Sequence, residues 1–167
     1  MDLHTILIFL HIAGTILGVG GATLAEVFYI SAVKDGGVDA SEKRLMHANY
    51  TMIRVGTLLV ALSGFALVLW WYFIANNPWP LESGKVWVKN IILLVIVVNA
   101  ILLSRRLVPF WLGASLSFTS WWGAALLGVW KNISYSFTEI LIGYIAAIFI
   151  IALILGSIRK IFLNKRQ

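Results

Sequence analysis

The chain has 167 residues and a formal net charge of +6, with 60% hydrophobic residues, 12% charged residues and a mean hydropathy of +0.92. These values exclude an ordinary water-soluble domain and are typical of an integral membrane protein. The sequence contains no cysteine, which excludes disulfides, thiolate metal sites and iron–sulfur clusters.

Long apolar segments follow one another with only short polar connectors between them. They predict transmembrane helices at residues 3–33, 40–75, 86–108, 109–131 and 136–163. Each contains the roughly 20 apolar residues that cross a bilayer, and helices satisfy their own backbone groups in lipid. We therefore predict an all-α fold, a single transmembrane domain over residues 1–167. It is expected to be an up-and-down bundle of five helices, in which four form the core and the fifth is peripheral.

Local signals mark the boundaries of several of these helices. Asp39 and Glu42 have the spacing of a capping box for the second helix, and Ser136 and Glu139 repeat that spacing before the fifth. Pro78 follows the second helix and predicts its end, because proline lacks a backbone donor and constrains the residue before it.

Basic residues are unevenly shared between the two predicted membrane faces. One face carries Lys34, Lys43, Arg44, Arg105, Arg106, Arg159, Lys160, Lys165 and Arg166, whereas the other carries Lys85, Lys89 and Lys131. The positive-inside rule then predicts a multi-pass membrane protein with its N-terminus outside and its C-terminus in the cytoplasm. The net charge is thus a topology signal, so we expect membrane lipid as a partner and no nucleic acid.

The first helix combines a histidine with a ridge of small residues. His11 and Gly18 fall on one line along the helix, with His4 at its outer end and Gly14 and Gly21 beside it. Small residues allow close approach of a neighbouring helix or of a flat ligand. His11 is therefore a candidate functional residue within the membrane, and the alternative is a hydrogen bond across a glycine-mediated helix contact.

Two charged residues are predicted at similar depth in the inner half of the membrane. Glu26 lies on the first helix and Arg54 on the second. His47 lies seven residues before Arg54 on the same face of the second helix, nearer the cytoplasm. We expect a structural Glu26–Arg54 ion pair, because buried charges need partners. A proton or ion path through these groups is the alternative.

Other polar and aromatic groups lie on the third and fourth helices. Lys89, in the outer half like His11, is either a lysine whose ammonium reaches the interface or a partner for an anionic ligand held against His11. Asn99 is expected to form an interhelical hydrogen bond. Trp121 and Trp122 lie in mid-membrane, where packing or the lining of a flat aromatic cofactor would account for them.

Several short motifs resemble a known superfamily of small bacterial membrane proteins. They are LHI at residues 10–12, GVGG at 18–21, EKRL at 42–45, the pair Ser63 and Gly64, and Lys89. The chain resembles proteins of the copper-resistance-D kind and their relative, the membrane-embedded, haem-associated protoporphyrinogen oxidase of bacteria. The resemblance implies a location in the bacterial cytoplasmic (inner) membrane. It is more similar still to an uncharacterised group in which the first-helix histidine precedes GVGGAT, here at residues 18–23. In the oxidase, a first-helix histidine and a third-helix lysine form the functional pair, and the resemblance maps these onto His11 and Lys89.

Three classes of function remain open. The first, which the resemblance favours, is a haem- or porphyrin-associated redox protein with haem b on His11 and with Lys89, Trp121 and Trp122 around the cofactor. The second is a non-catalytic subunit or scaffold of a larger membrane complex or homo-oligomer. The third is a small proton or metal transporter. The three histidines and three methionines are scattered in depth, so they predict no other metal site.

Overall fold

The computed structural model describes residues 2–35, 39–131 and 135–164, and within these ranges the secondary structure is helical with no strand. The predicted all-α class is therefore confirmed. The elements are α1 (Leu3–Asp35), α2 (Ala40–Leu69), a π-helical continuation η1 (Trp70–Ile74), α3 (Trp79–Glu82), α4 (Gly84–Ser104), α5 (Phe110–Val129) and α6 (Phe137–Asn164). Lys165 and Arg166, two of the basic residues predicted to lie on the cytoplasmic face, are outside the described ranges.

Four helices of the described chain are long and apolar enough to cross a membrane: α1, α2 with η1, α4 and α6. The 20-residue helix α5 is not among these four, and four hydroxyl side chains between residues 115 and 120 lower its hydropathy. The described residues form six α-helices instead of the expected five, because α3 occupies the connector after η1. Pro80 lies in the first turn of α3, where its missing N–H costs no hydrogen bond.

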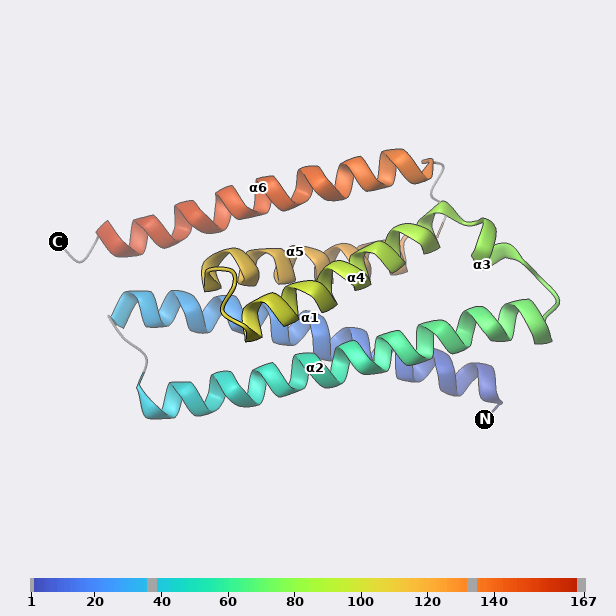
Figure 1. The fold of residues 1–167 in the computed structure, drawn as a ribbon, viewed down its shortest axis with the longest axis horizontal. Helices are drawn as coiled ribbons and strands as arrows, with labels where there is room; N and C mark the ends of the chain where they lie inside the picture. The colour runs from blue at the N-terminus through green and yellow to red at the C-terminus, as the bar shows by residue number, and fades with distance from the viewer. Residues whose placement is uncertain (1, 36–38, 132–134, 165–167) are drawn as a thin grey trace.

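The long helices run alongside one another in alternating directions (Figure 1). We call the end of the molecule where α1 begins the N end, and the end where α6 finishes the C end. Helix α1 packs against α2 along much of its length and against α5 on another side, whereas α2 has little contact with helices other than α1. This arrangement places α1 at the centre of the packing.

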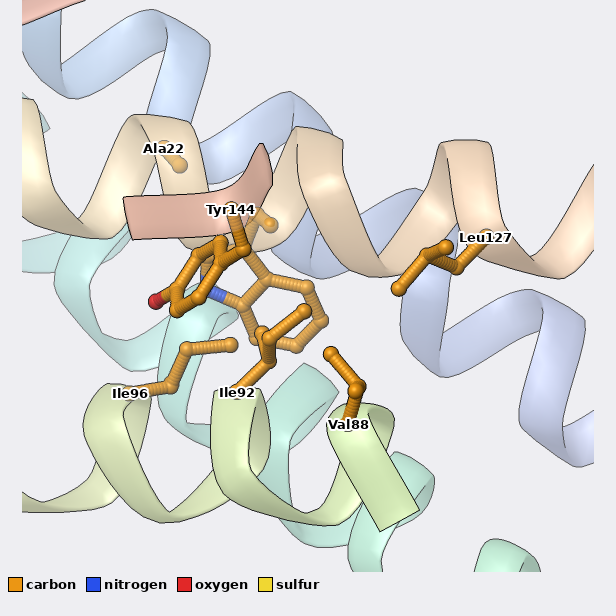
Figure 2. Packing of buried hydrophobic residues seen from close by; sticks show 7 residues of the cluster. Ala22, Val88, Ile92, Ile96, Leu127 and Tyr144 are labelled. Atoms are coloured by element: carbon orange, nitrogen blue, oxygen red, sulfur yellow. The ribbon is translucent and has the colours of Figure 1, made fainter. Parts of the chain in front are cut away.

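The buried core joins α4, α5 and α6. Figure 2 shows Ile92 and Ile96 of α4 directed toward Tyr144 of α6, and Trp121 of α5 belongs to the same cluster. The hydroxyl group of Tyr144 shares a hydrogen bond of 2.7 Å with that of Ser120 on α5. The expectation that the last helix is peripheral is therefore wrong: a face of α6 that includes Tyr144 is part of the core.

Both predicted capping boxes are confirmed. The carboxylate of Asp39 accepts from the backbone N–H of Glu42 at 2.7 Å, and the Glu42 carboxylate accepts from the N–H of Asp39 at 2.9 Å. At α6, the N–H of Ser136 donates to Glu139 at 2.7 Å, and the N–H of Glu139 donates back to the Ser136 hydroxyl at 3.4 Å. These bonds satisfy backbone donors that have no partner inside the helix.

Candidate functional site

His11 is held on α1 by a hydrogen bond to α2. Its Nδ1 lies 3.0 Å from the hydroxyl oxygen of Ser63, and the Ser63 hydroxyl is itself 2.5 Å from the carbonyl oxygen of Leu59. Because the Ser63 hydroxyl donates its proton to the carbonyl oxygen of Leu59, we assign the proton of the His11–Ser63 bond to Nδ1 of His11. The lone pair of Nε2 is then left without a partner among the described residues. The imidazole ring is thus oriented as in many metal-ligating histidines, which anchor one nitrogen and ligate through the other.

The neighbouring residue Gly64 makes room for this ring. A Cβ atom at Gly64 would lie 3.2 Å from Cε1 of His11, closer than nearly all ordinary contacts of such an atom. The Ser63–Gly64 pair therefore supplies both the acceptor for His11 and the space beside it. These two residues explain why the ring lies against α2.

Lys89 lies in the first two turns of α4, which begins at the same end of the molecule as α1 with His11 (Figure 1). Lys85 lies one turn earlier on the same helix. Lys85 donates to the carbonyl oxygen of Trp130 at 2.7 Å, whereas Nζ of Lys89 has no hydrogen-bond acceptor in the described part of the chain. Lys89 lies beside Gly128 of α5, since a Cβ there would be 3.8 Å from Nζ. The half-buried ammonium is therefore available to an anionic group.

The ridge of small residues on α1 is used for packing within the chain. A Cβ atom at Gly18 would lie 2.1 to 2.3 Å from carbons of the Trp121 indole, and one at Gly21 would lie 2.4 Å from Ile53. At Gly14, the corresponding distances are 2.8 Å to Leu59 and 3.0 Å to the carbonyl oxygen of Gly56. Helices α2 and α5 thus fill the ridge, and it offers no slot for a flat ligand at these positions.

The two tryptophans of α5 are not brought together with His11 as a cofactor lining. Trp121 is 1% exposed and packs in the core against Gly18, about 10 Å along α1 from His11 at helical rise. Trp122 is 42% exposed and donates through its indole N–H to the Thr23 hydroxyl at 3.1 Å. Of the four predicted cofactor residues, the structure therefore assigns the two tryptophans to helix packing. The pairing of His11 with Lys89 stays a prediction.

A buried ion pair lies toward the C end, and its basic partner is not the predicted one. The guanidinium group of Arg159 on α6 donates to the carboxylate of Glu26 on α1 at 2.5 Å, and the two residues are 6% and 3% exposed. The expected Glu26–Arg54 pair is wrong, because Arg54 lies on an exposed face of α2. There Arg54 donates to the Tyr50 hydroxyl at 3.1 Å and covers the Tyr50 ring.

The guanidinium of Arg159 joins three helices. It also donates to the carbonyl oxygen of Trp111 at 3.0 Å and to the hydroxyl of Ser115 at 3.1 Å, both on α5, and its Cζ lies 4.8 Å from the centre of the Tyr29 ring. From the sequence, Arg159 was interpreted only as one of the basic residues that indicate the cytoplasmic face of the membrane. The available clue was its position one turn beyond Leu155, on the face of α6 that is buried.

The other two histidines, His4 and His47, contact neither His11 nor the Glu26–Arg159 pair. His4 stacks on Trp70 of η1 with a centroid distance of 4.1 Å, and its ring meets Trp71 edge-on at 5.8 Å. His47 is exposed on the first turns of α2. Across the described residues, no group of three or more His, Cys, Asp or Glu side chains could hold a metal ion.

Comparisons with known proteins add no relative. The chain matches no protein-family model, no curated protein and no solved structure. A functional assignment therefore depends on the geometry around His11 and Lys89.

Proposed function

We propose that this protein is a haem- or porphyrin-associated redox protein of the membrane, centred on His11. The observation that carries the proposal is the anchoring of Nδ1 by Ser63, which leaves the Nε2 lone pair for an axial bond. The short motifs that resemble the copper-resistance-D and protoporphyrinogen-oxidase superfamily support it. We propose haem b as the cofactor, since the chain has no cysteine for the thioether attachment of haem c.

Two side chains would hold the cofactor. His11 would hold the iron of the cofactor, and the unpaired ammonium of Lys89 would pair with a carboxylate of the porphyrin. Bound haem would supply one-electron redox chemistry. No second histidine lies near His11, since His4 is engaged with Trp70 and His47 lies at the other end of α2. The proposed haem would therefore have a single protein ligand.

Two contacts bear on the alternative functions. A transport path through Glu26 conflicts with the position of that carboxylate, which is buried and paired to Arg159. A scaffold that recruits partners through the glycine ridge conflicts with the filling of that ridge by Ile53 and Trp121. Lipid remains the expected partner of the outward-facing apolar side chains, and assembly into a homo-oligomer or larger complex stays a proposal.

We further propose that α5 crosses the membrane as a fifth span. Helix α4 finishes toward the C end and α6 begins at the N end, so the chain between them has to pass from one end to the other (Figure 1). The N end is then the outer face of a bacterial cytoplasmic membrane. The described basic residues Lys43, Arg44, Arg105 and Arg106 at the C end support this orientation.

The orientation can be tested directly, because the natural chain is free of cysteine. Single cysteines at Asn77, after η1, and at Ser41, in the first turn of α2, serve as matched reporters. A maleimide that cannot cross the membrane should label Asn77→Cys in intact cells and Ser41→Cys only after lysis. The reverse pattern would overturn the proposed orientation, and labelling of both in intact cells would show mixed insertion.

The cofactor proposal is tested by absorption spectra of the detergent-purified protein, oxidised and dithionite-reduced. We expect a Soret band in the wild-type protein that is lost in His11→Ala and retained in His4→Ala. Lys89→Met should keep the band but weaken retention of haem during dilution. A colourless, folded protein from haem-supplemented cells, or an unchanged band in His11→Ala, would overturn the proposal.

A further inference from the structure

Arg54 of α2 uses only part of its guanidinium group within the chain. An N–H at Nη2 donates to the Tyr50 hydroxyl at 3.1 Å, and Cζ lies 4.3 Å from the centre of the Tyr50 ring. An arginine carries several N–H donors, and no other acceptor or carboxylate pairs with Arg54 in the described ranges. The residue is nevertheless exposed on a helix long and apolar enough to cross a membrane. Its remaining donors are therefore available to an anionic group from outside the chain.

Tyr50 indicates how close this guanidinium lies to the membrane surface. The Tyr50 hydroxyl is 3.5 Å from the carbonyl oxygen of Ala100 on α4, and Ala100 lies about 6 Å at helical rise before α4 ends at Ser104. With 21 residues, α4 has the length of the hydrocarbon core of a bilayer, roughly 30 Å. The side chain of Arg54 leans toward the start of α2, which lies at the C end (Figure 1). The guanidinium is therefore within reach of lipid headgroups at the C end.

Other side chains on the same face of α2 lead from Arg54 to the C end. They recur at spacings of four, three and four residues: Lys43, His47, Tyr50 and Arg54. This spacing places them on one face of the helix, where Lys43, His47 and Arg54 are exposed. Arg105 is also exposed, directly after the end of α4. The positive charge of this region favours an anionic headgroup over a zwitterionic one.

An apolar hollow of about 160 Å³ adjoins the same face of α2. Tyr50, which holds Arg54, is one of its lining residues, together with Ile53 of α2 and with Ala100 and Leu103 of α4. Helix α2 has little contact with α4, and the hollow between them is partly open. A hydrocarbon chain can therefore enter it from the bilayer.

The two asparagines that border the hollow direct their amide N–H groups to neighbouring helices. Asn49 donates to the carbonyl oxygen of Gly21 on α1 at 2.9 Å, and Asn99 donates to that of Gly113 on α5 at 2.7 Å. The second bond confirms the interhelical hydrogen bond predicted for Asn99. No charged side chain of the described chain lines the hollow, and its surface is mainly apolar. Such a surface suits an acyl chain and leaves the charged part of a ligand to Arg54.

We propose that an anionic phospholipid binds between α2 and α4, with its phosphate on Arg54 and one acyl chain in the hollow. A guanidinium group suits this role, because its planar N–H donors match the oxygens of a phosphate. Tyr50 connects the two parts of the site, since its hydroxyl holds the guanidinium and the same residue lines the hollow. Ala25, another lining residue, is about 21 Å along α1 from His11, so the lipid site is separate from the proposed haem site.

Native mass spectrometry of the detergent-purified protein tests the proposal. The protein is titrated with dioleoyl phosphatidylglycerol or with dioleoyl phosphatidylcholine, which share their acyl chains, and bound lipids are counted at each concentration. We expect the first lipid to bind at least roughly fivefold more tightly when it is phosphatidylglycerol, the effect of one basic residue at an anionic lipid surface. Glycerophosphoglycerol, the same headgroup without acyl chains, should not displace it at equal concentration.

Three variants make the outcome specific. Arg54→Gln should lower the preference for phosphatidylglycerol roughly fivefold. Arg44→Gln removes the same charge from an exposed position of α2 that lies off the Arg54 face, and it should leave the preference unchanged. Ala100→Leu fills the hollow and should weaken the binding of both lipids without changing their ratio.

Several results would overturn the lipid site. They are equal binding of the two lipids, an unchanged preference in Arg54→Gln, an equal loss in Arg44→Gln, full lipid binding in Ala100→Leu, and displacement by the headgroup alone. A second protein copy that is released by Arg54→Gln, in place of lipid, would also overturn it. Arg54 and Arg44 are both exposed, so this pair decides the test even if Ala100→Leu does not fold. None of these outcomes depends on haem.

Discussion

Arg159 of α6 is bound to Glu26 of α1 across the buried centre of three helices, and the same guanidinium also reaches α5. A buried pair of this kind is not an efficient source of stability, because both charges lose their hydration. Its two halves nevertheless depend on each other. Loss of either one leaves an unpaired charge in an apolar environment.

The first prediction concerns this dependence. Glu26→Gln and Arg159→Met should each lower the free energy of unfolding by about 3–5 kcal/mol, and the double variant should lose clearly less than the sum. Unfolding in mixed micelles, followed by circular dichroism, measures all three. Arg54→Met is the matched control, and it should change little because Arg54 is exposed on α2. Additive single effects would show that the two residues do not act as a pair.

The second prediction concerns the glycines of α1. Gly18→Ala should destabilise the protein by about 1–3 kcal/mol, because the added methyl group would overlap the Trp121 indole. Gly20→Ala, two residues further on, should be neutral or stabilising by up to about 1 kcal/mol, since a Cβ there meets nothing within 4 Å. The same unfolding assay compares the pair. Equal effects at both positions would contradict the packing of Trp121 on Gly18.

The third prediction tests the support that Ser63 gives to His11. Ser63→Ala removes the acceptor for Nδ1, so haem affinity should fall roughly 10- to 100-fold, as on loss of other partners of metal-bound histidines. Haem transfer to apomyoglobin, followed at the Soret band, measures the loss. Thr57→Ala, which removes a hydroxyl bound only within α2, is the control and should retain wild-type affinity. An unchanged transfer rate in Ser63→Ala would separate Ser63 from the cofactor.

The fourth prediction is a pH dependence at the start of α2. The backbone N–H of Glu42 donates to the Asp39 carboxylate and holds the pKa of Asp39 below its ordinary value of 3.8. Because the folded-state pKa is the lower one, the capping contribution is fully present above pH 3.8 and is lost as the pH falls through the lowered pKa. Asp39→Asn keeps a capping side chain that does not titrate. Its stability should therefore decline less than that of the wild type between pH 5 and about pH 2, as measured by thermal unfolding.

Local features of the sequence predicted the helices well. The capping pairs at Asp39 and Ser136 depend on residues three apart, and they are confirmed in the structure. Helix α3 was not predicted, because Pro78 and Pro80 signal a stop and proline is equally compatible with the first turn of a new helix. The π-helical end of α2 leaves no distinctive pattern in the sequence.

Long-range pairing could not be predicted in the same way. Glu26 clearly needed a basic partner, but the choice between Arg54 and Arg159 depends on which faces of α2 and α6 turn toward α1. Tyr144 fixes the rotation of α6 through its hydrogen bond to Ser120. Because α6 is apolar on every side, its sequence does not indicate which face is buried.

The pairing of Glu26 with Arg159 also sets an order of assembly. The two residues are 133 positions apart, so α1 is synthesised and enters the bilayer long before α6 exists. During that interval the carboxylate has no counter-ion from its own chain, and nascent α1 carries a costly group into lipid. Arrival of the last helix relieves it. A chain that ends before residue 159 therefore keeps Glu26 without its basic partner, and only the complete bundle neutralises this carboxylate.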